Sequence, residues 1–393
     1  MKILFLTPSL SGASETFIRD LILGLAKQGG QLTIACGDSD PPIDFEIPPN
    51  VAIKTVPYLA LTRLSDRLKF RLQRNKQEWS GSRDTLFDIN AMRYLGQLAD
   101  EETPDIAYVE FGWTLARSSN VFFDKGIPVI AHVHGADLTT YLNLPGYSDA
   151  LERGFHDAQA VIAASHHMRR LAILAGASPE KIHVIRLGVS IEDLEPMSWR
   201  KRRMSNPSIV FLGRMVAKKN PVALIEAFAR VKAETSDVTL NMIGDGPERT
   251  RAEERALQLG VESSVIWHGE LNRRAALEIV RENWIYAQHS VTPYSGDQEG
   301  FGISIAEASA LELPVVSTYH NGIPEQILHG ENGYLVQEYD FEEMSNRLSE
   351  LANNADLCER MGAIGRTNVL RNYSIEQRAS EIYDLLCGCS RTR

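Results

Sequence analysis

Short apolar runs alternate with segments of helical periodicity along almost the whole chain. In the segment 15–28, for example, apolar residues recur at three- and four-residue steps on one helical face. Repeated strand, helix and strand segments form a parallel sheet with helices on both faces. The pattern therefore predicts an α/β fold of the doubly wound type. The expected strands and apolar runs are residues 3–6, 32–36, 51–56, 106–110, 128–133, 160–164, 208–212, 238–243, 265–267, 285–292 and 314–317.

The composition is that of a globular enzyme with more than one domain. The chain has 393 residues, of which 44% are hydrophobic and 23% charged, enough for two or three domains with separate cores. Its 51 acidic and 41 basic side chains give a net charge of −10, which argues against a nucleic-acid partner. Its four cysteines lack metal-type spacing, so reduced thiols are expected. The opening segment does not resemble a signal peptide and no apolar run approaches a membrane span, so we expect a cytoplasmic protein.

The texture of the sequence changes between Leu187 and Pro207. Glycine, proline and the basic run 200–203 interrupt both periodicities there. We therefore expect a first domain over 1–190, a linker over 191–207 and a second domain over 208–373.

The segment from Glu299 to Glu307 is a candidate site. Glu299 and two glycines, Gly300 and Gly302, precede an apolar helix expected to begin at Ile303, and glycines leave room for a ligand beside the backbone. The unpaired N–H groups at the start of a helix favour an anion. The alternative is that both acids only cap and solvate the helix end.

A second candidate is the basic loop Gly213 to Asn220, which follows the strand 208–212. It holds Arg214, Lys218 and Lys219 just before a helix. Arginine binds phosphate in a bidentate manner and lysine adds a point charge, so the loop suits a diphosphate. The alternative is a solvated basic loop.

Two further features lie in the first half of the chain. His134 follows the strand 128–133, at the end of a strand where such sheets bind ligands. The alternative is a loop histidine without a ligand. Asp38 and Asp40 form a D-x-D triplet, which is a metal-binding signature in some enzymes, but acidic turns of this kind are common.

The string from Glu299 to Glu307, with Phe301 between the glycines, resembles the signature of the retaining nucleotide-sugar glycosyltransferases of family four (glycosyl transferases group 1). These enzymes have the GT-B fold, two Rossmann-like domains facing an interdomain cleft. The resemblance implies that Glu299 faces the donor sugar and that Glu307 holds the ribose. It also implies that His134 lies against the sugar and that the last helix, 374–393, packs back on the first domain.

The family motif G-R-x4-K maps onto Gly213, Arg214 and Lys219, with Lys218 the less favoured contact. The resemblance therefore implies the catalytic residues His134, Glu299, Arg214 and Lys219. The implied donor-binding residues are Gly213, Arg214, Lys219, Gly300, Phe301, Gly302, Ile303 and Glu307. On the acceptor side, Gly12 and Ala13 stand where the family usually has paired glycines. Ser14 begins a string, 14–18, that is similar to a subgroup building bacterial exopolysaccharides.

These features predict transfer of a hexose from a nucleoside diphosphate sugar, with UDP favoured and GDP as the alternative, to a glycan or lipid-linked hydroxyl. No metal or cofactor is expected, because Arg214, Lys219 and the helix end would stabilise the diphosphate. One alternative is a non-catalytic nucleotide-sugar-binding protein. Another is a glycoside hydrolase, which also uses two carboxylates but has no diphosphate to bind.

Segment 61–76 is basic and amphipathic. Leu61, Leu64, Leu68 and Leu72 mark one helical face, and six basic side chains stand against the single acid Asp66. Such a helix suits an anionic membrane surface, which would place the enzyme at the inner face of the membrane. The alternative is that the leucines pack on the core of the first domain.

Overall fold

The structure is a computed structural model that describes residues 1–10, 16–37, 46–56, 86–192 and 194–390, with only the backbone described at 86–90. The chain divides into two compact units. Unit 1 comprises Met1–Leu187 and Ile375–Arg393, and unit 2 comprises Gly188–Ser374. The predictions at Gly12, Ala13, Ser14, Asp38, Asp40 and 61–76 lie outside the described residues.

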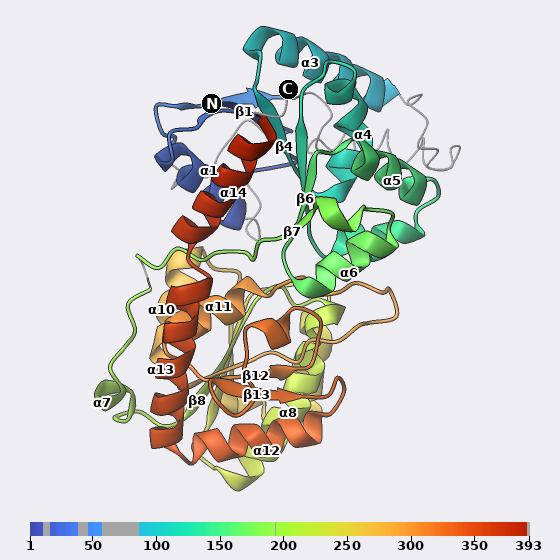
Figure 1. The fold of residues 1–393 in the computed structure, drawn as a ribbon. Helices are drawn as coiled ribbons and strands as arrows, with labels where there is room; N and C mark the ends of the chain where they lie inside the picture. Colours follow the sequence, from blue (N-terminus) through green and yellow to red (C-terminus); the bar gives the residue numbers. More distant parts are fainter. Residues whose placement is uncertain (11–15, 38–45, 57–85, 193, 391–393) are drawn as a thin grey trace. The chain divides into compact units, whose positions relative to one another are not determined.

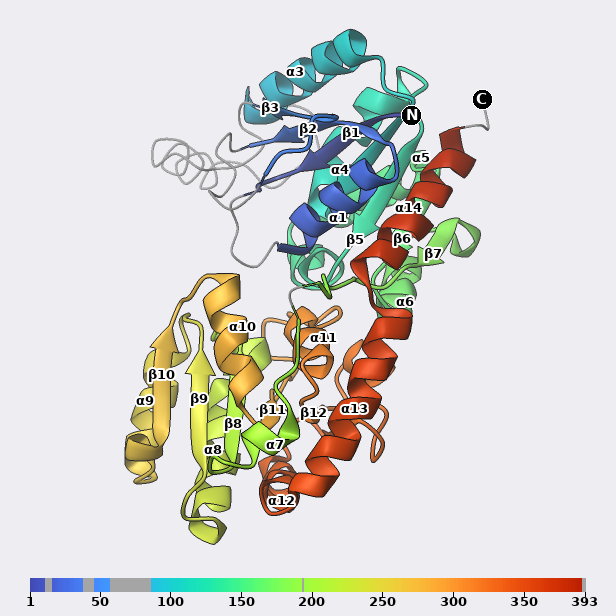
Figure 2. The same ribbon diagram turned by 90° about the vertical axis from the view of Figure 1, so that its left-hand side faces the viewer.

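Unit 1 is built on a seven-stranded sheet of parallel strands in the order β3-β2-β1-β4-β5-β6-β7 (Figure 1). The strands are β1 Lys2–Thr7, β2 Gln31–Cys36, β3 Val51–Thr55, β4 Ile106–Glu110, β5 Val129–Val133, β6 Ala160–Ala163 and β7 Ile182–Val184. The helices are α1 Thr16–Lys27, α3 Leu86–Glu102, α4 Gly112–Phe123, α5 Tyr147–Asp157, α6 His166–Leu174 and α14 Ile375–Ser390. Helices α1 and α14 cover one face of the sheet, and α4 lies on the other (Figure 2).

The central strands of unit 1 are buried on both faces. All five residues of β4 are buried, and so are all five of β5. A parallel strand covered by helices on both sides has no solvent-facing side, so its sequence is mostly apolar, and Glu110 and His132 are the buried polar exceptions here. Sheets of this kind bind ligands at the carboxyl ends of their strands.

The last helix, α14, packs along α1 within unit 1. Arg378 of α14 is only 2% exposed and donates from Nη1 to the backbone oxygen of Phe17 at 3.3 Å. Its guanidinium also lies 5.8 Å from the centre of the Phe17 ring. The C-terminal segment therefore contributes a buried cation to the interior of unit 1.

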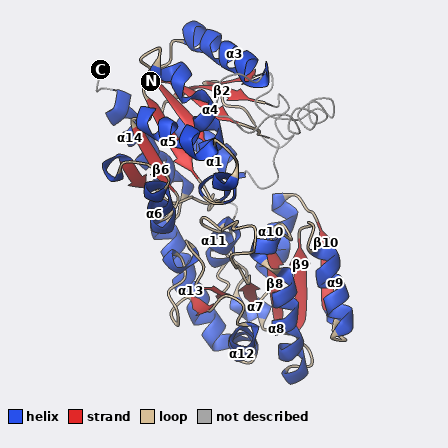
Figure 3. Ribbon diagram, turned by 90° about the vertical axis from the view of Figure 1, so that its right-hand side faces the viewer, coloured by secondary structure: helices blue, strands red, loops and turns tan. Residues whose placement is uncertain are grey.

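Unit 2 repeats the design with six parallel strands in the order β10-β9-β8-β11-β12-β13 (Figure 3). The strands are β8 Ser208–Leu212, β9 Thr239–Ile243, β10 Val265–Gly269, β11 Ile285–Ala287, β12 Val315–Thr318 and β13 Gly333–Val336. The helices are α7 Trp199–Arg202, α8 Pro221–Glu234, α9 Arg249–Gln258, α10 Arg273–Glu282, α11 Ile303–Ala310, α12 Phe341–Ala352 and α13 Ala355–Asn372. The two sheets confirm the predicted pair of Rossmann-like domains.

The segment 191–207, predicted as a linker, falls within unit 2, and part of it belongs to the core of that unit. Trp199 is 3% exposed within that core. Arg202 is fully buried and donates to the backbone oxygens of Arg281, Leu311 and Glu312. A basic run normally indicates solvent exposure, but this arginine is held by unpaired carbonyls at two helix ends.

Candidate active site

The loop after β8 brings two lysines under the carboxyl edge of the unit 2 sheet. At Gly213 a Cβ atom would lie 3.1 Å from Cε and 3.2 Å from Nζ of Lys219, so only glycine leaves the lysine its path over the backbone. Asn220 then caps α8, because its side chain accepts a hydrogen bond from the Ala223 N–H at 3.3 Å. Arg214 between these residues is exposed.

Lys219 pairs with the first glutamate of the predicted motif. Its Nζ lies 3.0 Å from Glu299 Oε2 and donates to Gln288 Oε1, also at 3.0 Å. Burial would raise the pKa of Glu299, but the charges of Lys219 and then Lys218 outweigh burial and lower that pKa to about 2. Glu299 is therefore an ionised, largely buried carboxylate at neutral pH.

Lys218 also connects the loop after β8 to the loop that carries Glu299. Its Nζ donates to Asp297 Oδ1 and to the backbone oxygen of Gln298, each at 3.2 Å. Its backbone oxygen accepts from the Val291 N–H at 2.8 Å. Lys218 thus supports the acidic loop.

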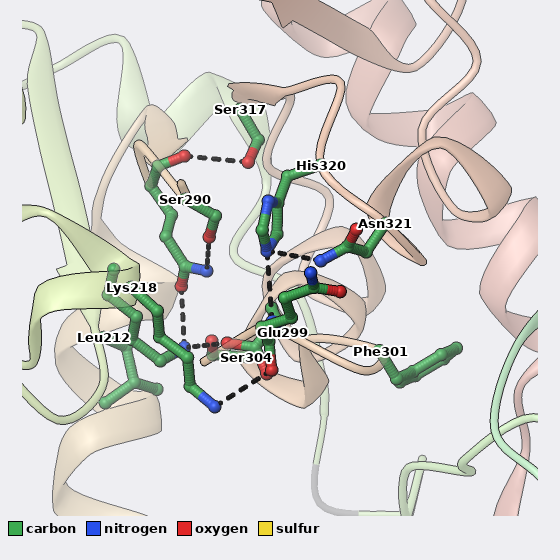
Figure 4. A network of polar contacts seen from close by, with 12 residues as sticks. Leu212, Lys218, Ser290, Glu299, Phe301, Ser304, Ser317, His320 and Asn321 are labelled. Carbon is green, nitrogen blue, oxygen red and sulfur yellow. Dashed lines mark hydrogen bonds and ion pairs between the residues drawn. The ribbon is translucent and has the colours of Figure 1, made fainter. Parts of the chain in front are cut away.

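A layer of buried polar side chains supports the pair (Figure 4). Gln288 donates from Nε2 to Ser290 Oγ at 2.7 Å, and Ser317 Oγ donates to the backbone oxygen of Gln288 at 2.8 Å. All three residues are fully buried. Because these contacts orient the Gln288 amide, its Oε1 faces Lys219 and fixes the ammonium.

The loop that follows Glu299 leads directly into α11. Gly302 is the N-cap residue with φ +88°, and no side chain among the described residues caps this helix end. The ring of Phe301 points away from Lys218 and Glu299 (Figure 4), is 2% exposed and packs 5.5 Å from the Tyr373 ring centre. The side chain of Phe301 therefore anchors the loop, and only its backbone is available to a ligand.

The second glutamate, Glu307, has a partner that the sequence did not indicate. Glu307 is 6% exposed, and its Oε1 accepts from Arg273 Nε at 2.9 Å. Arg273 is the first residue of α10, far from α11 in the sequence. The arginine balances the charge of a carboxylate that lies one turn inside α11.

In unit 1, His134 is held by two acids. Its Nε2 lies 2.7 Å from Oε2 of Glu110, the last residue of β4. Its backbone N–H donates to both oxygens of the fully buried Asp137, each at 2.9 Å, and burial raises the pKa of Asp137. The His134 ring also packs against Phe17 and Phe111, with ring centres 5.1 Å and 4.8 Å away. The imidazole is therefore fixed in place and 12% exposed.

A second histidine lies behind the first. His132 Nδ1 is 3.4 Å from Glu110 Oε2, 2.9 Å from Tyr108 Oη and 3.4 Å from Arg378 Nη2. Burial lowers the pKa of His132 to about 3, so its imidazole is neutral at pH 7. Burial would raise the pKa of Glu110, but the facing histidines, His132 first, lower it well below its usual value.

Glu110, His132 and His134 are a carboxylate and two imidazoles of the kind that can hold a divalent metal, with ligand atoms within 4.8 Å of one another. The Arg378 guanidinium at 3.4 Å from His132 opposes a second cation there. The three side chains are of types that bind metals, but the positive charge of Arg378 disfavours a metal ion at this place.

Unit 2 thus carries Arg214, Lys219, Glu299, Gly300 and Gly302 on loops at one edge of its sheet and Ile303 and Glu307 on α11, whereas His134 belongs to unit 1. Sequence reasoning missed Glu110, Arg273, Arg378 and also Glu338, which follows β13 and contacts His320. Glu110 is the last residue of the expected strand 106–110 and Arg273 the first residue of α10, so both were accessible to a search of strand and helix ends. Glu338 and Arg378 gave no signal, because the strand before Glu338 is short and Arg378 acts from a distant helix.

Comparisons with known proteins agree with this geometry. The family model for glycosyl transferases group 1 matches residues 198–368, and that for glycosyltransferase family 4 matches residues 14–193. One relative is a putative colanic acid biosynthesis glycosyltransferase of Salmonella typhimurium, 26% identical over 254 residues, which span 64% of this chain and 62% of the relative. Another is a GDP-mannose-dependent alpha-(1-6)-phosphatidylinositol monomannoside mannosyltransferase of Mycolicibacterium smegmatis, 28% identical over 67% of this chain and 71% of the relative.

Among solved structures, Anabaena HepE in complex with UDP has a TM-score of 0.78 over 99% of this chain and 100% of that chain, at 19% identity. The same protein with UDP-glucose has a TM-score of 0.76. At this identity the likeness shows a shared fold. With both units matched by their family models, the chain belongs to the family 4 glycosyltransferases (glycosyl transferases group 1) and has the GT-B fold.

Proposed function

We propose that this protein is a retaining hexosyltransferase that moves a hexose from a nucleoside diphosphate sugar to a hydroxyl group. The observation that carries the proposal is the 3.0 Å pair of Lys219 and Glu299 in loops beside the start of α11. A cation, an ionised carboxylate and an uncapped helix end suit a diphosphate and the sugar attached to it.

The diphosphate leaving group would be stabilised by Arg214, Lys219 and the amino end of α11. The Arg214 guanidinium is exposed and has no partner among the described residues, so it is available to a ligand. Preorganised donors of this kind stabilise charge that develops as the bond to the diphosphate breaks. We therefore propose that transfer requires no metal ion or cofactor.

The remaining roles follow the family pattern. Glu299 would face the sugar, Glu307 would accept a ribose hydroxyl, and His134 would contact the sugar. The backbones of Gly213, Gly300, Phe301, Gly302 and Ile303 would line the nucleotide. A carboxylate has about four lone-pair sites on its two oxygens, so Glu307 could accept from a ribose hydroxyl as well as from Arg273.

The proposed donor is a UDP-sugar, with a GDP-sugar as the alternative. The structural neighbour binds UDP and UDP-glucose, whereas one of the sequence relatives depends on GDP-mannose. The proposed acceptor is a glycan or a lipid-linked glycan of polysaccharide or glycolipid synthesis, as the names of the relatives indicate.

We also propose peripheral contact of the basic segment 61–76 with an anionic membrane, from the cytoplasmic side. No helix among the described residues combines the length and apolarity needed to cross a membrane. In co-sedimentation at low salt, the protein should pellet with anionic vesicles and not with neutral ones. Reversal of charge at Arg67, Lys69 and Arg71 should release it, and equal behaviour on both lipids would contradict the proposal.

The test of the activity begins with thermal shifts in the presence of UDP, GDP and their sugars, since a ligand that binds the folded state raises the melting temperature. Glu307→Gln should then weaken UDP binding by about tenfold, because a ribose hydroxyl loses a charged acceptor. Glu299→Gln should leave UDP binding nearly unchanged and lower transfer. The reverse pattern in calorimetry would refute the assignment of the two acids.

A further inference from the structure

The loop that carries Glu299 is attached at both ends to one carboxylate, that of Glu338. Glu338 follows β13, and its Oε2 accepts a hydrogen bond from the Thr292 N–H at 2.8 Å. Its other oxygen, Oε1, lies 2.6 Å from His320 Nδ1. The other ring nitrogen, His320 Nε2, lies 3.1 Å from the backbone nitrogen of Glu299. A single side chain therefore holds the beginning of the loop directly and its end through one histidine.

These contacts fix the tautomer of His320. A backbone N–H can only donate, so His320 Nε2 must present its lone pair to Glu299. The Asn321 side-chain amide nitrogen lies 2.7 Å from the same ring nitrogen and faces it as a second donor (Figure 4). The proton is therefore on Nδ1, from which it is donated to Glu338. An acceptor at position 338 is needed to keep the proton on Nδ1 and the lone pair of Nε2 directed at Glu299.

The pair is rigid where it meets the loop. His320 is fully buried, so its ring has no room to turn, while the side chain of Glu338 is 27% exposed. Tyr339, the next residue, donates from its hydroxyl to the backbone oxygen of Thr292 at 3.0 Å and so reinforces the same loop end. Inside the loop, the contact between Lys218 and Asp297 adds a third attachment. The backbone of Glu299 is held independently of its side-chain pair with Lys219.

We infer that Glu338 and His320 are positioning residues that set the place of the Glu299 carboxylate relative to the sugar. This inference rests on the proposed function, in which Glu299 faces the donor sugar. A small misplacement of such a group lowers the rate of the chemical step while the nucleotide still binds. The pair should therefore affect turnover and leave nucleotide affinity unchanged.

The first test is a double-mutant cycle. Glu338→Ala should lower kcat by about 100-fold and change the Kd for UDP by less than about twofold. When Glu299 is already Gln, the same change should lower the remaining rate by less than about threefold, because Glu338 acts through Glu299. The inference is overturned if the second loss equals the first. Glu342→Ala, a nearby change at a 74% exposed side chain on α12, is the matched control and should leave kcat unchanged.

Conservative variants guard against a fold defect in the alanine variant. His320→Gln keeps an acceptor close to the position of Nε2, and His320→Asn keeps only a donor close to Nδ1. The Gln variant should retain at least about tenfold more of the wild-type kcat, provided both bind UDP like the wild type. Equal rates in the two variants would mean that the contact with Glu299 is unimportant.

The second test does not depend on activity. Amide hydrogen exchange at Thr292 and Glu299 should accelerate by about tenfold or more in Glu338→Ala, because both N–H groups lose or loosen their acceptor. Unchanged exchange at both amides would overturn the inference whatever the kinetics. If the wild type transferred no sugar from any nucleotide donor, the proposed function would fail on its own, and exchange would still decide whether Glu338 holds the loop.

Discussion

Unit 1 and unit 2 each place a histidine against a glutamate at the carboxyl edge of a parallel sheet, but a different ring nitrogen faces the glutamate in each pair. In unit 1, Glu110 approaches Nε2 of His134 at 2.7 Å and is itself fully buried. In unit 2, Glu338 approaches Nδ1 of His320 at 2.6 Å and is partly exposed. The other ring nitrogen of His320, Nε2, faces the backbone N–H of Glu299. In unit 1, the backbone N–H of His134 itself donates to Asp137.

The difference shows how one sheet topology supports two different histidine–glutamate arrangements. Carboxyl ends of adjacent parallel strands meet at one edge, so a histidine after one strand readily meets a glutamate after the next. The ring nitrogen that faces the carboxylate then determines which ring nitrogen is left to contact another group. In unit 1 the glutamate fixes a ring that is 12% exposed, and in unit 2 it fixes a fully buried ring that holds the backbone of another loop.

The largest effect should follow removal of the cation in unit 2. Lys219→Ala should lower kcat by about 10²–10³-fold, on the scale of losing one preorganised electrostatic donor. Glu299 would lose its 3.0 Å partner as well as the diphosphate contact. Steady-state kinetics with the best nucleotide sugar measures the loss, and Lys201→Ala, at an exposed lysine of α7, is the control. Wild-type turnover in the folded variant would place the diphosphate elsewhere.

A smaller loss is expected in unit 1. Glu110→Gln should lower kcat by about tenfold, because the ring of His134 loses a charged partner but keeps its backbone bonds to Asp137 and its aromatic packing. The rates of this variant and of Glu101→Gln, at an exposed position on α3, should be compared. A loss as large as that of Lys219→Ala would mean that the unit 1 pair takes part directly in the reaction.

Much of the fold was predictable from the sequence, and the reason is burial on both faces. Apolar runs such as 106–110 and 208–212 coincide with β4 and β8 because parallel strands bury most of their residues, all five in β4 and the central three in β8. The edge strands β7 and β13, of three and four residues, were missed because they are too short to show a pattern. The burial of Trp199 was not predicted, because Arg202, three residues further on, looks like a solvent-exposed charge in the sequence although it is buried.

The candidate site was predictable only in part. Motif residues such as Lys219 and Glu299 can be recognised in the sequence, because their spacing follows local turns and helix starts. Their partners come from remote elements: Arg273 from α10 and Glu338 from the end of an edge strand. Such partners are set by the register of the sheet and not by local sequence, so single-sequence patterns cannot locate them.

The stability of unit 1 should also respond to acid through His132. His132 beside Glu110 has a pKa of about 3 in the folded protein against its usual 6.5, and burial is the cause. Between these values the unfolded chain binds a proton that the folded chain does not, so this group destabilises unit 1 as the pH falls, by about 1.4 kcal/mol per pH unit. Denaturant unfolding from pH 7 to 4 should show a shallower loss in His132→Gln, and no such change in His156→Gln, whose side chain is 82% exposed. Parallel pH profiles for His132→Gln and the wild type would contradict this origin.

The smallest effect, none at all, is expected when metal ions are removed. Glu110, His132 and His134 form a group of potential ligands, yet Arg378 already lies 3.4 Å from His132 and supplies a fixed positive charge. In unit 2 the proposed diphosphate contacts are the cations Arg214 and Lys219, which make a bridging metal unnecessary. Transfer should therefore proceed at an unchanged rate in excess EDTA, and calorimetry with Zn²⁺ or Mn²⁺ should give the same result for the wild type and for Glu110→Gln. A complete loss in EDTA that Mn²⁺ restores would reverse this reading. If Glu110→Gln also abolished Mn²⁺ binding, the unit 1 group would be the metal site, and if it did not, Asp38 and Asp40 would be the residues to change next.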